Sequence, residues 1–215
     1  HGRACILTAT TFNCHEMVDV VGEAPANPWV FFDMSIDDKP VGRIVFHLRA
    51  DLVPIASENF RSLCTGWKGK GIKGKPLHYK NTIFHRIIPD RLMAGGDVVN
   101  GDGTDGESIY GPYFDDENFI LRHVGPGCLS TCNRGPDTND SRFFLTLGKA
   151  TYLDEKSVVF GYVMHGMDVI KKIEEYGTPH TGEPKKRVVV EDCGECTPWK
   201  AIKAGEIGGR MAGDD

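Results

Sequence analysis

Residues 29–49 read WVFFDMSIDDKPVGRIVFHLR, and this stretch decides the fold class. Apolar residues recur at every second position from Val30 to Ile36 and again from Ile44 to Leu48. A period of two is typical of a strand with one buried face. Between the two halves, Asp37-Asp38-Lys39-Pro40 has the residue types of a turn. The stretch therefore predicts a hairpin of two half-buried antiparallel strands.

The chain that follows the hairpin contains many short strand patterns and only two helix patterns. Pro54 begins a run with helical spacing that stops at Gly66, and a second run over 167–176 stops at Gly177. Short apolar runs bounded by Gly, Asn, Asp and Pro predict strands at 82–88, 92–99, 128–132, 143–147, 158–163 and 188–190. Because these strands do not alternate with helices, we expect a closed antiparallel barrel with one helix over each open end.

Length and charge limit the domain organisation and the partners. A chain of 215 residues with 40% apolar residues is long enough to form one sizeable core. We expect an N-terminal extension at 1–26, one domain at 27–194 and a C-terminal tail at 195–215. The net charge is -5, and no apolar run approaches the roughly 18–20 residues that span a bilayer. We therefore expect no nucleic-acid partner and no membrane segment.

Several collinear motifs between residues 27 and 194 carry a family resemblance. The chain resembles cyclophilins in the order and spacing of Phe84-His85-Arg86-Ile87-Ile88-Pro89, Ala94-Gly95-Gly96-Asp97, Gly106-Glu107-Ser108-Ile109-Tyr110-Gly111, Asp116-Glu117-Asn118-Phe119 and residues 135–144. This resemblance implies an all-β fold, an eight-stranded antiparallel β-barrel capped by two α-helices. It also implies peptidyl-prolyl cis–trans isomerase activity on proline-containing segments of peptides and proteins, which uses no metal and no other cofactor.

The same resemblance assigns the groove residues. Arg86 matches the catalytic arginine, whose permanently charged guanidinium can withdraw the lone pair of the proline nitrogen. Phe144 matches the base of the proline pocket, and Asn133 matches the residue whose main chain holds the substrate backbone. The other substrate-binding positions are Arg91, Leu92, Ala94, Cys132, Arg134, Arg142, Tyr152, Leu153 and Ser157.

Several of these positions depart from the family pattern. Arg91 and Leu92 stand where a Phe and a Met usually line the proline pocket, and Ala94 stands where a Gln usually orients the arginine. The remaining departures are Tyr152 for Trp, Ser157 for His, Arg142 for Gln, and Cys132 and Arg134 for two Ala. An aromatic wall contributes about 1.5–3 kcal/mol of apolar burial, which a charged side chain does not supply. We therefore expect a more basic groove, weaker isomerase activity and weak cyclosporin binding.

A second function class stays open beside the isomerase. The chain can be a cyclophilin-like scaffold or binding module that joins a larger protein assembly through its N- and C-terminal extensions. Arg86 and Phe144 favour the enzyme, whereas the substituted groove positions favour the scaffold.

The segment between Gly66 and Lys80 is longer than in compact cyclophilins and resembles the divergent-loop subgroup. That resemblance implies a redox pair of Cys64 and Cys193 and a glutamate, Glu107, that helps hold the loop. Two buried structural thiols are the alternative. The seven cysteines form no compact framework, so we expect a reducing compartment and cytoplasmic localisation. An organellar location stays open, because the chain begins at His1 and a leader would precede it.

Overall fold

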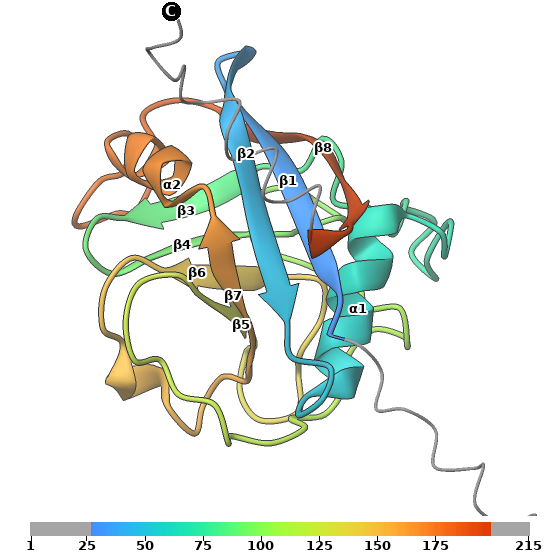
Figure 1. Ribbon diagram of the computed structural model, residues 1–215. Helices are drawn as coiled ribbons and strands as arrows, with labels where there is room; N and C mark the ends of the chain where they lie inside the picture. The colour runs from blue at the N-terminus through green and yellow to red at the C-terminus, as the bar shows by residue number, and fades with distance from the viewer. Residues whose placement is uncertain (1–26, 199–215) are drawn as a thin grey trace, which may run out of the picture.

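The computed structural model describes residues 27–198 as one eight-stranded sheet that curls into a barrel, with two α-helices packed on it (Figure 1). The extension at 1–26 and the tail from 199 onward lie outside the described residues. The order of the strands around the sheet is β3-β4-β6-β5-β7-β2-β1-β8, and every neighbouring pair is antiparallel. Their bounds are β1 Trp29–Ile36, β2 Lys39–Leu48, β3 Phe84–Ile88, β4 Leu92–Gly95, β5 Cys128–Thr131, β6 Phe143–Thr146, β7 Val159–His165 and β8 Val188–Cys196.

The two edges of this sheet meet where the chain enters β3. The backbone N–H of Val190 donates to the carbonyl of Thr82 over 2.9 Å, and the N–H of Asn81 donates to the carbonyl of Val190 over 2.7 Å. These bonds bring β8 beside β3 and nearly close the barrel. The prediction of an antiparallel barrel with two helices is confirmed.

The helices lie on different sides of the barrel. The first, α1 Pro54–Thr65, packs against β1 and β8, and the second, α2 Met167–Glu174, packs against β2 (Figure 1). Both were predicted, although α2 ends two residues earlier than expected. Gly66 ends α1 in a left-handed conformation with φ of 70°, as its position after the last apolar residue indicated. No helix within residues 27–198 has the length and apolar character needed to cross a bilayer.

A cluster of aromatic rings fills the interior. The cluster consists of Phe32, Phe46, Phe60, Tyr79 and Phe143, and the rings that contact each other have centroids 5.0 to 5.8 Å apart. Edge-to-face and tilted pairs at this spacing are favourable beyond the burial of their area. Phe60 joins α1 to the barrel in this way, and the Tyr79 hydroxyl donates to the carbonyl of residue 141 over 2.6 Å. The long loop before β3 is thereby attached to the segment that leads into β6.

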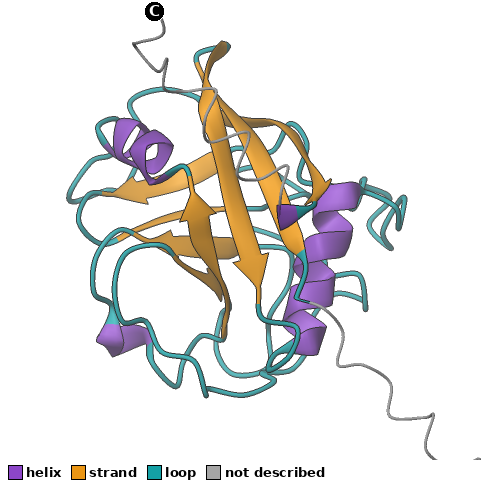
Figure 2. Cartoon of the chain, in the orientation of Figure 1, coloured by secondary structure: helices purple, strands orange, loops and turns teal. Residues whose placement is uncertain are grey.

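Two strands, β4 and β8, differ from their predicted bounds by more than two residues. β4 ends at Gly95, because Gly96 has a φ of +84° and the Asp97 carboxylate then accepts backbone N–H groups from Val99, Asn100, Gly103 and Asp105. These bonds fold residues 97–105 into a compact loop. β8 runs to Cys196, two residues past the expected domain boundary, because it pairs with β1 over its whole length. Long connections such as 96–127 occupy much of the molecule outside the sheet (Figure 2).

Candidate active site

A groove of about 750 Å³ lies between the outer face of β3, β4 and β6 and the loops that surround it. Nine of the twelve groove positions predicted from the sequence line it: Arg86, Leu92, Ala94, Cys132, Asn133, Arg142, Phe144, Leu153 and Ser157. The other three, Arg91, Tyr152 and Arg134, are chain neighbours of lining residues but are not part of the lining. The sheet and four separate loops thus bring most of the predicted residues together.

The groove also contains residues that the sequence analysis missed. They are His85, Asp102, Gly103, Thr104, Lys156, Thr181 and Glu183. His85 precedes Arg86 on β3, and burial lowers the pKa of its imidazole. The ring lies against Gly103, so the loop organised by Asp97 forms one wall of the groove. Thr181 and Glu183 follow α2 by several residues, and no local pattern in the sequence indicated that they reach this site.

Arg86 has a guanidinium group without a polar partner in the described part of the chain. The residue is exposed on β3 opposite Ala94, whose methyl group offers no hydrogen bond. The Arg86 side chain has no hydrogen-bond acceptor and no carboxylate partner among residues 27–198. Its aliphatic part passes close to Gly182, where an added Cβ would lie 2.8 Å from Cγ of Arg86. The donors of Arg86 are therefore free for a ligand, while its stem is restrained by packing.

Phe144 lies in the middle of β6 and has a rigid support beneath it. The fully buried His123 ring stacks on it with centroids 5.6 Å apart and an interplanar angle of 19°. Nδ1 of His123 lies 2.8 Å from the Asp154 carboxylate, and Nε2 lies 3.0 Å from the Ser130 hydroxyl. Burial lowers the pKa of His123, although Asp154 opposes this shift. A neutral imidazole with both nitrogens engaged holds the aromatic base of the groove in place.

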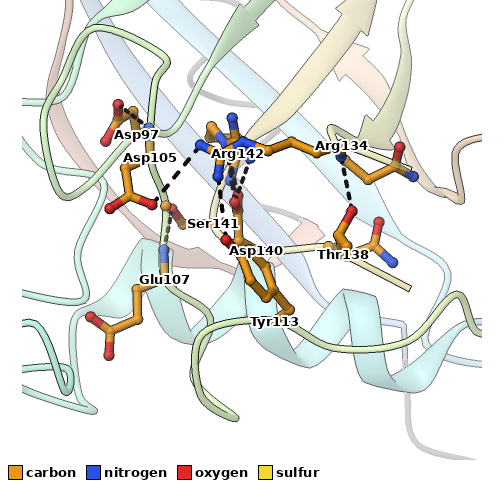
Figure 3. A network of polar contacts seen from close by, with 12 residues as sticks. Asp97, Asp105, Glu107, Tyr113, Arg134, Thr138, Asp140, Ser141 and Arg142 are labelled. Carbon is orange, nitrogen blue, oxygen red and sulfur yellow. Dashed lines mark hydrogen bonds and ion pairs between the residues drawn. The ribbon is translucent and has the colours of Figure 1, made fainter. Parts of the chain in front are cut away.

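Arg142 enters the groove wall as half of an ion pair (Figure 3). Its Nε lies 3.0 Å and its Nη2 2.6 Å from Oδ2 of Asp140, and Nη1 donates to the carbonyl of Gly103 over 3.0 Å. The side chains are 6% and 0% exposed. Arg142 therefore contributes its shape and its hydrogen bonds to the groove wall, but the buried Asp140 carboxylate compensates its positive charge.

Arg134 is also engaged. Its guanidinium donates to the carbonyl of Thr104 and to the Tyr113 hydroxyl, the latter over 3.3 Å, and lies 4.0 Å from the Asp105 carboxylate (Figure 3). The Arg91 guanidinium, in contrast, lies over the ring of Tyr152, with its carbon 5.4 Å from the centroid, and has no carboxylate partner among residues 27–198. The groove is thus less basic than the sequence suggested, because two of its three additional arginines have carboxylates beside them.

The loop before β3 is attached to the groove wall from behind. The buried Glu107 carboxylate accepts the backbone N–H of Ile72 and, over 3.1 Å, that of Lys73. The Lys73 ammonium also reaches the Asp105 carboxylate at 2.5 Å. Residues 102–104 line the groove. Asp105 and Glu107, which follow them, therefore connect this groove wall to the loop before β3.

The two cysteines predicted as a redox pair are both free thiols in the core. Cys64 lies in the last turn of α1 and is fully buried, while Cys193 lies in β8 and is 8% exposed. Burial raises the pKa of both thiols, that of Cys193 to about 12. At neutral pH both sulfurs are protonated and packed as small apolar groups.

One comparison with known proteins identifies the architecture. A family model described as "Cyclophilin type peptidyl-prolyl cis-trans isomerase/CLD" matches residues 31–195. The match runs from β1 to β8 and includes every residue that lines the groove.

Proposed function

The chain belongs to the cyclophilin-type peptidyl-prolyl cis–trans isomerase family, and we propose that it rotates X-Pro bonds of client proteins with Arg86 as its catalytic residue. The barrier to this rotation, about 18–20 kcal/mol, comes from amide resonance. A cation that donates a hydrogen bond to the proline nitrogen withdraws its lone pair and weakens that resonance. The observation that carries the proposal is the unpaired guanidinium of Arg86 in the same groove as Phe144 and Leu92.

The groove residues divide this task between them. Phe144, Leu92 and Leu153 present the apolar surface against which a proline ring can pack. Asn133 lines the groove, and its side chain donates to the carbonyl of Lys156 over 2.7 Å and so fixes the local main chain. We infer that this main chain holds the client backbone while Arg86 acts on the proline nitrogen.

We propose that the activity is lower than in a cyclophilin with an orienting glutamine. Ala94 cannot hydrogen-bond to Arg86 or to a client carbonyl, so the arginine is positioned by packing alone. A misplacement of about one ångström can reduce a rate on the order of a hundredfold. We also propose weak cyclosporin binding, because the half-exposed Tyr152 replaces a larger ring at the groove rim, and isothermal titration would measure it.

The decisive experiment measures exchange between the cis and trans forms of a short prolyl peptide by NMR. Arg86→Ala is expected to reduce the catalysed exchange rate by about a hundredfold, the effect of losing one transition-state donor. Arg187→Ala is the matched control, since Arg187 is an exposed arginine in the turn before β8. Equal exchange in the wild type and Arg86→Ala would reject the enzyme and favour a cyclophilin-like binding module.

We further propose that the chain is a divergent-loop cyclophilin of a reducing, cytoplasmic compartment. The bonds from Glu107 to the loop amides support the subgroup, and the protonated core thiols suit a reducing environment. Cys64 and Cys193 would form a disulfide only after the core opens. Thiol counting by mass spectrometry after mild oxidation tests this pair, and seven free thiols would refute it. For the alternative scaffold function, we propose that the chain joins a larger protein assembly through its N- and C-terminal extensions.

A further inference from the structure

The arginines around the groove fall into two pairs with different electrostatic states. Arg134 and Arg142 have carboxylates and carbonyls beside them (Figure 3). Arg86 and Arg91 have neither a hydrogen-bond acceptor nor a carboxylate partner for their guanidinium groups among residues 27–198. The proposed reaction accounts for the free guanidinium of Arg86. It does not account for that of Arg91.

Arg91 is held at one end of the groove by an aromatic ring. It lies in the turn that joins β3 to β4, directly before the lining residue Leu92, and its guanidinium is placed over the ring of Tyr152. Tyr152 is 46% exposed and directly precedes another lining residue, Leu153. A cation–π contact with the ring uses none of the N–H donors of Arg91 as hydrogen bonds, so these donors stay available. The fork of Arg91 is thus positioned at the rim and open to solvent.

Charged side chains of both signs surround this rim. Lys156 lines the groove, and its ammonium group also has no partner among the described residues. Among the nearby acidic residues, Asp154 pairs with His123 and Glu155 with Arg122. Asp90, the chain neighbour of Arg91, and Glu183, which lines the groove, have no ion-pair partner among residues 27–198. An anion placed here would meet two cations, Arg91 and Lys156, that have no ion-pair partner in the part of the chain that the structure describes.

We propose that Arg91, positioned by Tyr152, selects client segments that carry an anionic side chain, a carboxylate or a phosphate, within about two residues of the proline. This inference rests on the proposed isomerase groove. Leu92 and Leu153 border the apolar surface for proline. Their chain neighbours, Arg91 and Tyr152, contact each other beside this surface. Because an extended peptide advances about 3.3 Å per residue, the first or second residue beside proline is the one that reaches the rim.

The test uses a set of prolyl peptides that differ at one position. Glutamate, glutamine, phosphoserine or serine is placed one or two residues before proline, or one or two residues after it, which gives four series. Affinity is measured by NMR titration, and isomerisation is measured separately by exchange. In one series, we expect the glutamate peptide to bind about three- to tenfold more tightly than the glutamine peptide at low ionic strength, and the ratio to fall as salt is added. A phosphoserine-to-serine ratio larger than the glutamate-to-glutamine ratio assigns the preference to phosphate, and the reverse order assigns it to carboxylate.

Variants identify the residue that makes the choice. Arg91→Gln is expected to bring both ratios to about one, whereas Arg91→Lys keeps part of the preference because it keeps the charge but loses the fork. Tyr152→Ala is expected to reduce the ratios by releasing the guanidinium, and Arg187→Gln leaves them unchanged. An unchanged preference in Arg91→Gln, or a wild type without preference in any of the four series, would overturn the proposal. If the affinity ratios hold but no peptide shows catalysed exchange, the isomerase proposal fails and the anion preference stands.

Discussion

The buried ion pair in the groove wall allows a quantitative prediction about stability. Asp140 and Arg142 are two residues apart, and the guanidinium nitrogens lie between 2.6 and 3.1 Å from the carboxylate oxygens. Substituting Asp140→Asn removes one charge and leaves the other almost fully enclosed. The amide oxygen can still accept from Arg142, but the amide nitrogen that replaces the second oxygen is a donor, so the change removes the charge together with one acceptor.

The expected loss follows from the burial. Two unit charges about 4 Å apart attract by about 4 kcal/mol at an effective dielectric constant of about 20. Removing one partner of a buried pair costs about 3–5 kcal/mol, because the remaining charge is uncompensated. Urea unfolding followed by circular dichroism measures this free energy. With a slope of about 2 kcal/mol per molar urea, the midpoint should fall by roughly 1.5–2.5 M.

The protein contains a matched control for this experiment. Arg49 and Asp51 are also two residues apart and also form two bonds, of 2.8 and 2.7 Å, but their side chains are 28% and 34% exposed. Asp51→Asn should therefore cost less than about 1 kcal/mol, as exposed pairs do. In the double variant Asp140→Asn/Arg142→Gln, the loss should be well below the sum of the single losses. Additive single losses, or an Asp140→Asn midpoint shift no larger than that of Asp51→Asn, would refute the reasoning.

Three further predictions concern the loop, the base of the groove and the core. Glu107→Ala should lower the hydrogen-exchange protection of the Ile72 and Lys73 amides by about 10- to 100-fold, because their hydrogen bonds to a charged group are lost. Unchanged protection would show that the loop keeps its conformation without Glu107. Burial lowers the pKa of His123 below its unfolded value, so the unfolded chain binds more protons and stability should decrease as pH falls below about 6.5. Thermal unfolding at several pH values should show a smaller decrease for His123→Asn than for the wild type, and equal decreases would contradict this. In native labelling with iodoacetamide, the groove thiol of Cys132 should react before Cys64 and Cys193, and simultaneous labelling would show that the core opens readily.

The parts of the fold that were predicted correctly are those with local causes. The start of α1 at Pro54 and its end at Gly66 depend on the backbone preferences of those two residues. β8 was predicted only at its apolar start, Val188–Val190, because the strand then continues through polar residues that pair with β1. Pairing with a distant strand leaves no periodic pattern in the strand itself, so its second half could not be predicted.

The site shows the same division between local and distant causes. The resemblance assigned each groove residue separately. It placed Arg142 in the groove, and we therefore predicted that the positive charge of Arg142 makes the groove more basic. The structure places Asp140 beneath it, and the tight turn at Gly96 and Asp97 brings Gly103 to its other side. Whether a charge is compensated depends on burial and on contacts across the fold, which single-residue comparison does not include.

Gly182 packs against Arg86, which Ala94 cannot orient as the glutamine usual at that position in cyclophilins would, and this leads to a final prediction. Its φ of +73° suits glycine, and an added Cβ would lie 2.8 Å from Cγ and 3.1 Å from Nε of Arg86. Gly182→Ala should therefore displace the guanidinium and lower catalysed exchange by 10- to 100-fold, on the order expected for such a misplacement. Gly74→Ala is the matched control, because Gly74 has a φ of +74° and an added Cβ would meet no atom within 4 Å. Both variants carry the same backbone cost of about 1 kcal/mol, so equal losses of activity would show that strain rather than the position of Arg86 is responsible. If packing on Gly182 positions the arginine, Gly182→Ala should have no further effect once Arg86→Ala is present.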